Sequence, residues 1–168
     1  NKEYAEKISF IQNAVGAVPS PFDCYLLTRS IKTLSVRMKQ HNENAIAVSN
    51  YLSNHPKIEK VFFPGTDKRH KEIAEKQMDG FGGMMSFVID SDINGVKTFL
   101  KNLNLFTLAE SLGGVESLIE HPAIMTHASI DPSIREKLGI SETLLRISVG
   151  IEDVDDLISD LDQALSKI

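Results

Sequence analysis

Residues 144–150 place a single cation, Arg146, in an otherwise apolar strand pattern. Burying a guanidinium is costly unless a fixed anion meets it, and its planar fork of N–H groups suits bidentate binding of a carboxylate. Upstream, residues 109–114 read Ala-Glu-Ser-Leu-Gly-Gly, a turn in which the Ser111 hydroxyl and backbone N–H groups could bind the same anion. The two segments together predict a site for a small-molecule carboxylate.

Taken alone, these residues also have structural interpretations. Arg146 could equally form a structural ion pair with Glu152 or Asp153, which follow it closely in the chain. Ser111 could be an ordinary turn serine, and Glu110 a solvated loop carboxylate. The residue types and spacing leave both interpretations open.

Two histidines, His121 and His127, flank a proline-containing loop. Their spacing matches no zinc-binding pattern, and no cysteine or acidic cluster completes one. We therefore predict no metal site, and we interpret both histidines as structural.

The composition is that of a globular protein. The chain has 168 residues, which is the size of one domain or of one domain with part of another. The formal net charge is −5 and the basic residues are scattered among acids, so we predict no nucleic-acid partner. The only cysteine, Cys24, excludes a disulfide within the chain and is expected to be buried on a helix.

The predicted cellular location depends on the absence of membrane-spanning and signal segments from the sequence. No apolar run reaches the length of a membrane span, and the first residues are charged and contain no apolar signal core. A soluble, cytoplasmic protein without a membrane partner is therefore expected. The chain starts at Asn1 instead of methionine, so we also expect a fragment or a processed product.

Hydrophobic periodicity predicts an alternation of helices and strands. The expected helices cover residues 2–14, a segment from about 21, 34–54, 70–78, 92–103 and a segment from about 153, and the expected strands cover residues 58–63, 84–89, 105–108, 115–119 and 144–149. Interleaved strands and helices are typical of a small α/β (α+β) sandwich, here with about four strands and helices on one face. The long helix at 34–54 is expected to join two structural regions.

Four blocks of sequence carry a resemblance to a known family. Residues 12–26, 109–117, 125–129 and 145–153 occur in the same order and are similar to segments of the pyridoxal-phosphate enzymes of Cys/Met metabolism. The resemblance extends over essentially the whole chain, which corresponds to the C-terminal portion of such an enzyme. Within the family, the γ-lyase branch is the nearest match and the γ-synthase branch is the next.

The resemblance implies a fold and a set of site residues. The fold is type I of the pyridoxal-phosphate enzymes, with residues 1–34 ending the large cofactor-binding domain and residues 35–168 forming the small C-terminal domain. Arg146 would bind the substrate α-carboxylate and Ser111 would assist. Glu110 would lie near the distal end of the substrate, and Thr126 would line the same pocket.

The resemblance also implies an activity. The enzyme would be a carbon–sulfur lyase of transsulfuration that cleaves cystathionine to cysteine, 2-oxobutanoate and ammonia, with pyridoxal 5'-phosphate as cofactor. The alternative enzyme reaction is γ-replacement on an acyl-homoserine. A third possibility is a non-catalytic module for amino-acid binding or assembly.

The chain departs from the family pattern in what it lacks. The Ser-x-Thr-Lys pattern around the Schiff-base lysine does not occur in this sequence. We therefore expect no catalytic and no cofactor-binding residue in this chain, and no activity from it alone. By analogy, the cofactor would be bound mainly by the rest of the enzyme, with which this chain would associate in a homotetramer.

Overall fold

The computed structural model describes residues 1–66 and 70–168, and the chain divides into two units, Asn1–Ser35 and Val36–Ile168. The first unit contains α1 (Lys2–Val15) and α2 (Pro21–Ile31). The helix expected from about residue 21 is α2: Ser20 and Asp23 form a reciprocal capping box at its start, and Pro21 occupies the first turn. Gly16 ends α1 in the left-handed conformation, at φ 66°.

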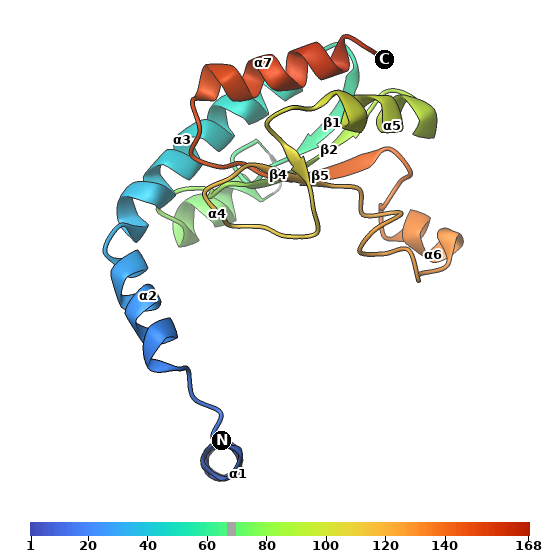
Figure 1. The fold of residues 1–168 in the computed structure, drawn as a ribbon. Coiled ribbons are helices and arrows are strands. Elements are labelled where there is room, and N and C mark those ends of the chain that lie inside the picture. Colours follow the sequence, from blue (N-terminus) through green and yellow to red (C-terminus); the bar gives the residue numbers. More distant parts are fainter. Residues whose placement is uncertain (67–69) are drawn as a thin grey trace. The chain divides into compact units, whose positions relative to one another are not determined.

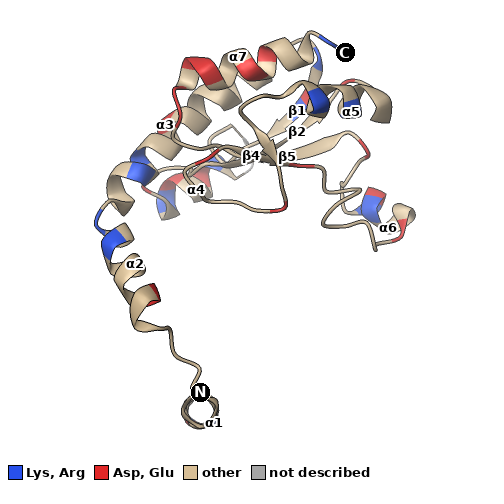
Figure 2. Ribbon diagram, in the orientation of Figure 1, with Lys and Arg blue, Asp and Glu red and all other residues tan. Residues whose placement is uncertain are grey.

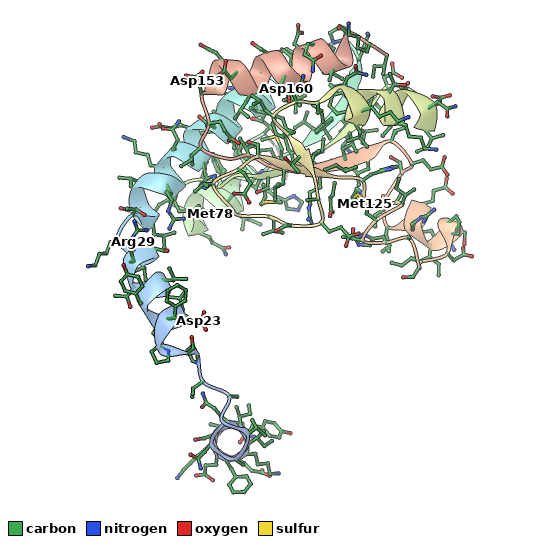
Figure 3. All side chains as sticks on the ribbon, in the orientation of Figure 1. Asp23, Arg29, Met78, Met125, Asp153 and Asp160 are labelled. Carbon is green, nitrogen blue, oxygen red and sulfur yellow. The ribbon has the colours of Figure 1, made fainter. Side chains whose placement is uncertain are left out.

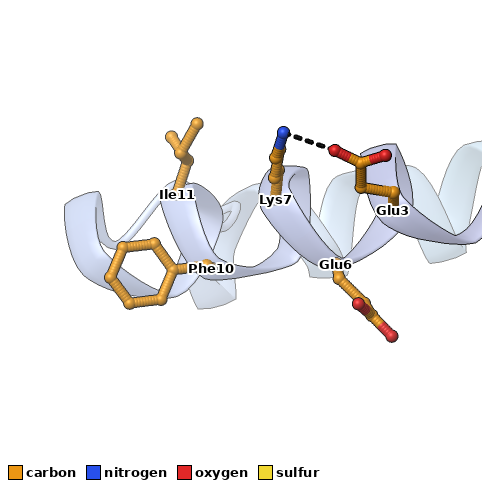
Figure 4. A pocket seen from close by; sticks show the side chains of 5 residues that line it. All are labelled: Glu3, Glu6, Lys7, Phe10 and Ile11. Carbon is orange, nitrogen blue, oxygen red and sulfur yellow. Dashed lines mark hydrogen bonds and ion pairs between the residues drawn. The ribbon is translucent and has the colours of Figure 1, made fainter.

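Neither helix of the first unit has a buried residue. On α1, Lys7 Nζ lies 2.7 Å from Glu3 Oε1, while Phe10 and Ile11 stand exposed beside this pair (Figure 4). The prediction that Cys24 is buried is wrong: Cys24 is exposed, and α2 has no buried residue in the described part of the chain.

The second unit contains a mixed sheet of five strands, one at each of the five expected strand segments, although about four strands were expected in the sandwich. The strand order is β1-β2-β5-β4-β3, and all neighbours are antiparallel except β3 and β4, which are parallel. The strands are β1 (Ile58–Phe62), β2 (Met84–Ile89), β3 (Thr107–Leu108), β4 (Leu118–Glu120) and β5 (Leu144–Ser148).

Three long helices lie along the sheet (Figure 1): α3 (Leu34–Ser53), α5 (Ile93–Asn102) and α7 (Val154–Leu165). Their apolar stripes and alternate strand residues form one core, in which Phe87 and Phe99 meet edge to face with ring centroids 6.2 Å apart. Burial of this apolar surface is the main force that holds α3, α5 and α7 to the sheet. The predicted fold class is thus confirmed.

Two helices of the second unit begin at an aspartate. Asp92 and Asp153 cap α5 and α7 by accepting backbone N–H groups of the first turn. Acidic residues gather at the start of α7 (Figure 2), where Asp155 and Asp156 face the positive end of the helix dipole.

Three elements differ from the predictions. The strand expected at 115–119 is β4, which starts later because the backbone N–H of Ser117 is donated to the Glu152 side chain instead of a strand. The strand expected at 105–108 is reduced to β3. The short helix α6 (Pro132–Lys137) was not predicted; it has no buried residue, so it lacks the apolar periodicity that reveals longer helices.

α4 (Lys71–Gln77) lies within the helix expected at 70–78. No helix in the described part of the chain is both long and apolar enough to cross a membrane.

Candidate functional site

Arg146 lies on β5, between two neighbouring strands of the sheet. Its Cα is paired with Ser86 of β2 on one side and with Glu120 of β4 on the other. Strand residues alternate between the two faces of a sheet, and Leu145 and Ile147 point into the helical core. Ser86, Arg146 and Glu120 therefore form a row on the face opposite that core.

The Glu120 carboxylate contacts the Arg146 guanidinium. Arg146 Nη2 lies 3.0 Å from Glu120 Oε2, and the Glu120 side chain is 1% exposed while that of Arg146 is 28% exposed. Within residues 1–66 and 70–168, Glu120 Oε2 takes part in no hydrogen bond of good geometry, so its interaction with Arg146 is a close ion pair. Glu120 thus holds the guanidinium through Nη2, and the Arg146 side chain as a whole remains partly open to solvent.

Thr126 reaches the same carboxylate from the loop after β4. Its Oγ1 lies 3.4 Å from Glu120 Oε1 and 2.8 Å from His127 Nδ1. The loop turns back on itself at Met125 (labelled in Figure 3), whose sulfur accepts the His121 backbone N–H at 3.2 Å. Thr126 and Arg146 thus contact different oxygens of the Glu120 carboxylate: Thr126 contacts Oε1, and Arg146 contacts Oε2.

The turn that contains Ser111 is attached to β5 close to Arg146. Gly113 N–H donates to Ser148 Oγ at 2.9 Å, and Ser148 lies two residues after Arg146 on the same face. Gly113 has φ 78°, a conformation that favours glycine. Ser111 and Glu110 are exposed, and among the described residues neither forms a hydrogen bond or ion pair with Arg146.

The ion-pair partners that the sequence suggested for Arg146 are wrong. Glu152 instead accepts the Ser117 backbone N–H at 2.7 Å and the Ser117 hydroxyl at 2.9 Å. Asp153 caps α7. Both carboxylates therefore hold the backbone around the end of β5, and the carboxylate that pairs with Arg146 is that of Glu120.

Glu120 is the member of this group that sequence analysis missed. It ends the short apolar run Leu118–Ile119, just beyond the strand expected at 115–119. An acid at the end of an apolar strand is itself a signal of a buried charge pair. Its partner could not be read from the sequence because the register between β4 and β5 is a tertiary feature.

An apolar cavity of about 400 Å³ adjoins the same face of the sheet. Ser148 and Gly113 are among the residues that line it, so it borders the Ser111 turn. His41, Gly82 and Gly83 also line it, and the remaining lining side chains are apolar: Met38, Pro64, Met78, Phe81, Met84 and Val149.

His121, next to Glu120, is fully buried. Its Nε2 lies 2.8 Å from the Glu142 carbonyl oxygen, while its Nδ1 has no hydrogen-bond partner within the described residues. Burial lowers the pKa of His121, against the opposing effect of the Glu142 carbonyl. In the described part of the chain, no cluster of three or more His, Cys, Asp or Glu side chains is arranged to hold a metal ion.

Comparison with known proteins identifies the family. The model of the Cys/Met metabolism PLP-dependent enzymes matches residues 1–166. Cystathionine gamma-lyase from Dictyostelium discoideum is 55% identical over 168 residues, and cystathionine beta-lyase from Coxiella burnetii is 52% identical over 166 residues. These matches cover 99% and 98% of this chain but 43% of each relative, so the chain spans less than half of their length.

A solved structure agrees with the sequence matches. Cystathionine gamma-lyase from Lactobacillus plantarum, in complex with L-serine, superposes with a TM-score of 0.90 at 44% identity, covering 100% of this chain and 44% of that one. The family model, the sequence relatives and the fold agree over nearly all of the 168 residues: the chain belongs to the Cys/Met metabolism family of PLP-dependent enzymes.

Proposed function

We propose that this chain is the C-terminal part of a PLP-dependent carbon–sulfur lyase and that it provides the binding site for the substrate's α-carboxylate. The observation that carries the proposal is the environment of Arg146: Glu120 holds its guanidinium at 3.0 Å, yet the Arg146 side chain remains 28% exposed. A guanidinium has five N–H donors, so one ion-paired nitrogen leaves others for a second carboxylate. Bidentate binding of this kind orients an amino acid as well as retaining it.

The proposed substrate is cystathionine, cleaved with water to cysteine, 2-oxobutanoate and ammonia. The proposal is supported by relatives named cystathionine gamma-lyase at 53–56% identity, among them the enzymes of Bos taurus and Rattus norvegicus. Fixing the α-carboxylate would hold the Cα–H bond of the substrate in one orientation, a positioning effect.

We assign a separate role to each of the other three site residues. Ser111 would add a hydroxyl donor to the same carboxylate, since its turn is attached to β5 beside Arg146. Glu110 would lie near the distal end of the substrate, consistent with its exposure. Thr126, which was expected to line the pocket, contacts Glu120, so we assign it to the support of the carboxylate site.

Pyridoxal 5'-phosphate supplies an electron sink for reactions at the amino acid's carbons. The side chains grouped around Arg146 are Ser86, Glu120, Thr126 and His127, and none carries a primary amine. This group does not fit covalent attachment of the cofactor. We therefore propose that the cofactor is held by another part of the enzyme, and that this chain by itself does not turn over cystathionine.

Association with the rest of the enzyme, as a cytoplasmic homotetramer, completes the proposal. The first unit supports it: Tyr4, Ile8, Ile11 and Val15 form an apolar stripe on α1 that is 58–70% exposed in this chain. Such a stripe needs a partner surface to be stable in water. In this proposal, residues 1–34 end the large cofactor domain and residues 35–168 form the small domain. No nucleic acid or membrane is assigned as a partner.

Steady-state kinetics of Arg146→Ala in the full-length enzyme test the proposal. We expect the KM for cystathionine to rise by at least about 100-fold, as loss of a charged hydrogen-bonded partner predicts. The variant should also lose stability, because Glu120 is left buried without its cation. A matched control is Arg135→Ala, because Arg135 bonds the Ala123 carbonyl oxygen at 2.7 Å and takes no part in the Arg146 group. Unchanged kinetics of Arg146→Ala would refute the carboxylate site.

Cystathionine β-cleavage is a second candidate, favoured by the Coxiella burnetii relative named cystathionine beta-lyase at 52% identity. Both reactions need the α-carboxylate site, so Arg146 does not discriminate between them. The products do: γ-cleavage releases cysteine and 2-oxobutanoate, and β-cleavage releases homocysteine and pyruvate. The γ-replacement alternative is tested by supplying an acyl-homoserine with cysteine.

A further inference from the structure

Glu120 is one of two buried acidic residues in the described part of the chain; the other is Asp160. Asp160 accepts backbone N–H groups from Asn104, Leu105 and Phe106, which compensate its charge. Glu120 has no such donors: Oε1 meets the Thr126 hydroxyl at 3.4 Å, and Oε2 meets Arg146. The burial of this carboxylate is therefore compensated mainly by one cation.

The same pair restricts Arg146. A free arginine side chain samples many rotamers, and fixing it costs conformational entropy. Here Glu120 lies on the adjacent strand, directly opposite Arg146, so that the backbone register holds both groups. The ion pair uses Nη2 and leaves the guanidinium's other N–H groups without a protein acceptor among the described residues.

We propose that Glu120 is a positioning residue for substrate binding: it orients the Arg146 guanidinium toward an incoming α-carboxylate, and Thr126 in turn holds Glu120. This inference rests on the proposed function, because it concerns the same carboxylate site. Neither Glu120 nor Thr126 touches the substrate in this role. Both act through Arg146.

Two effects of Glu120 oppose each other. Its negative charge repels the substrate carboxylate, which weakens binding. Its fixed contact with Arg146 organises the donor groups before the substrate arrives, which strengthens binding. The cation lies between the two carboxylates and offsets their repulsion, so the positioning effect dominates and removal of the Glu120 charge weakens binding.

The test is Glu120→Gln in the full-length enzyme, which retains the side-chain size and removes the charge. We expect the KM for cystathionine to rise on the order of tenfold, with a smaller change in kcat, as for other residues that orient a ligand-binding group. Thr126→Val should also raise the KM for cystathionine, but by a smaller factor than Glu120→Gln. Glu59→Gln, an exposed carboxylate on β1, is the matched control and should leave both constants unchanged.

A comparison of two inhibitors separates positioning from a merely structural effect. Glycine and methylamine differ by a carboxylate, so the ratio of their inhibition constants measures carboxylate recognition. Glu120→Gln should weaken the binding of glycine and leave the inhibition constant of methylamine unchanged. In an Arg146→Ala background, Glu120→Gln should have no further effect on glycine, since it acts through the arginine.

The outcomes are distinguishable. If Arg146→Ala leaves cystathionine and glycine binding unchanged, the proposed function fails. If Arg146→Ala weakens both and Glu120→Gln leaves glycine binding unchanged or tighter, only the positioning role of Glu120 is overturned. If Glu120→Gln does not fold, Thr126→Val decides, and an unchanged glycine constant in that folded variant overturns the inference.

Discussion

Asn44 on α3 donates from its Nδ2 to the carbonyl oxygen of Gly150, at 3.0 Å, across 106 residues of sequence. The same nitrogen donates to the Glu152 carbonyl oxygen at 2.8 Å. His41, one turn earlier on α3, has its Nδ1 2.7 Å from the Val149 carbonyl oxygen. The helix thus holds the chain that leaves β5 directly after Arg146.

Asn44→Ala should destabilise the second unit. The substitution leaves buried carbonyl groups without their donor, which costs about 1–3 kcal/mol in the free energy of unfolding. Urea denaturation followed by circular dichroism measures the effect. Asn50→Ala, an exposed position on the same helix, should change the free energy of unfolding by less than about 0.5 kcal/mol. Equal effects of the two substitutions would contradict the assigned role of Asn44.

Asp160 should make stability depend on pH in the acid range. Burial raises the pKa of Asp160, but the N–H groups of Leu105, Asn104 and Phe106 outweigh it and hold the pKa below the ordinary value of 3.8. A lowered folded-state pKa contributes stability that is complete above the unfolded-state value and is lost as pH falls through the folded-state pKa. Wild-type stability should therefore decline below about pH 4.

Asp160→Asn tests this account. At neutral pH the free energy of unfolding of the variant should be about 1–3 kcal/mol lower than that of the wild type. Below about pH 4 its stability should depend less on pH than wild-type stability does. Thermal unfolding across pH measures both. Asp90→Asn, at an exposed carboxylate, is the control and should retain the wild-type pH profile. A profile of Asp160→Asn parallel to the wild type would rule out the N–H cluster as the cause.

His121 should titrate below 6.5. Burial lowers its pKa because the charged imidazolium loses hydration, and its Nδ1 lacks a hydrogen-bond partner within the described residues. The folded state therefore favours the neutral ring, and this contribution to stability is present above the unfolded-state pKa and is lost as pH falls. NMR titration of the imidazole C–H resonances gives the pKa directly. A midpoint at or above 6.5 would contradict this prediction.

Gly113→Ala should impair substrate binding through the backbone. Gly113 has φ 78°, where a Cβ costs roughly 1–2 kcal/mol. Its N–H donates to Ser148 Oγ, so strain there would displace the Ser111 turn from β5. We expect a several-fold rise in KM of the full-length enzyme, together with a modest loss of stability.

Gly139→Ala is matched to it. Gly139 has φ 77° and, as at Gly113, an added Cβ would meet no atom within 4 Å, but it follows α6 away from the Ser111 turn. This variant should lose a similar amount of stability and retain the wild-type KM. Similar KM values for the two variants would show that the turn does not need to be fixed at β5.

Much of the fold could be predicted because it is local. The helices expected from about 21, over 92–103 and from about 153, and the strand expected at 84–89, all occur where sequence patterns place them. Caps and alternation depend on residues close in the chain, so they can be read from the sequence. By contrast, α6 was not predicted, because a short helix that buries no residue produces no apolar periodicity.

The sequence by itself determined that one strand carries a cation with a glycine-rich turn upstream, and that the chain resembles one enzyme family. Only the tertiary structure decided what meets that cation. Glu152 and Asp153 are near in sequence, but they bind Ser117 and cap α7, whereas Glu120 pairs with Arg146 across β4 and β5. The physical reason is that charge pairing in a sheet follows strand order and register, and both arise from packing of the whole core.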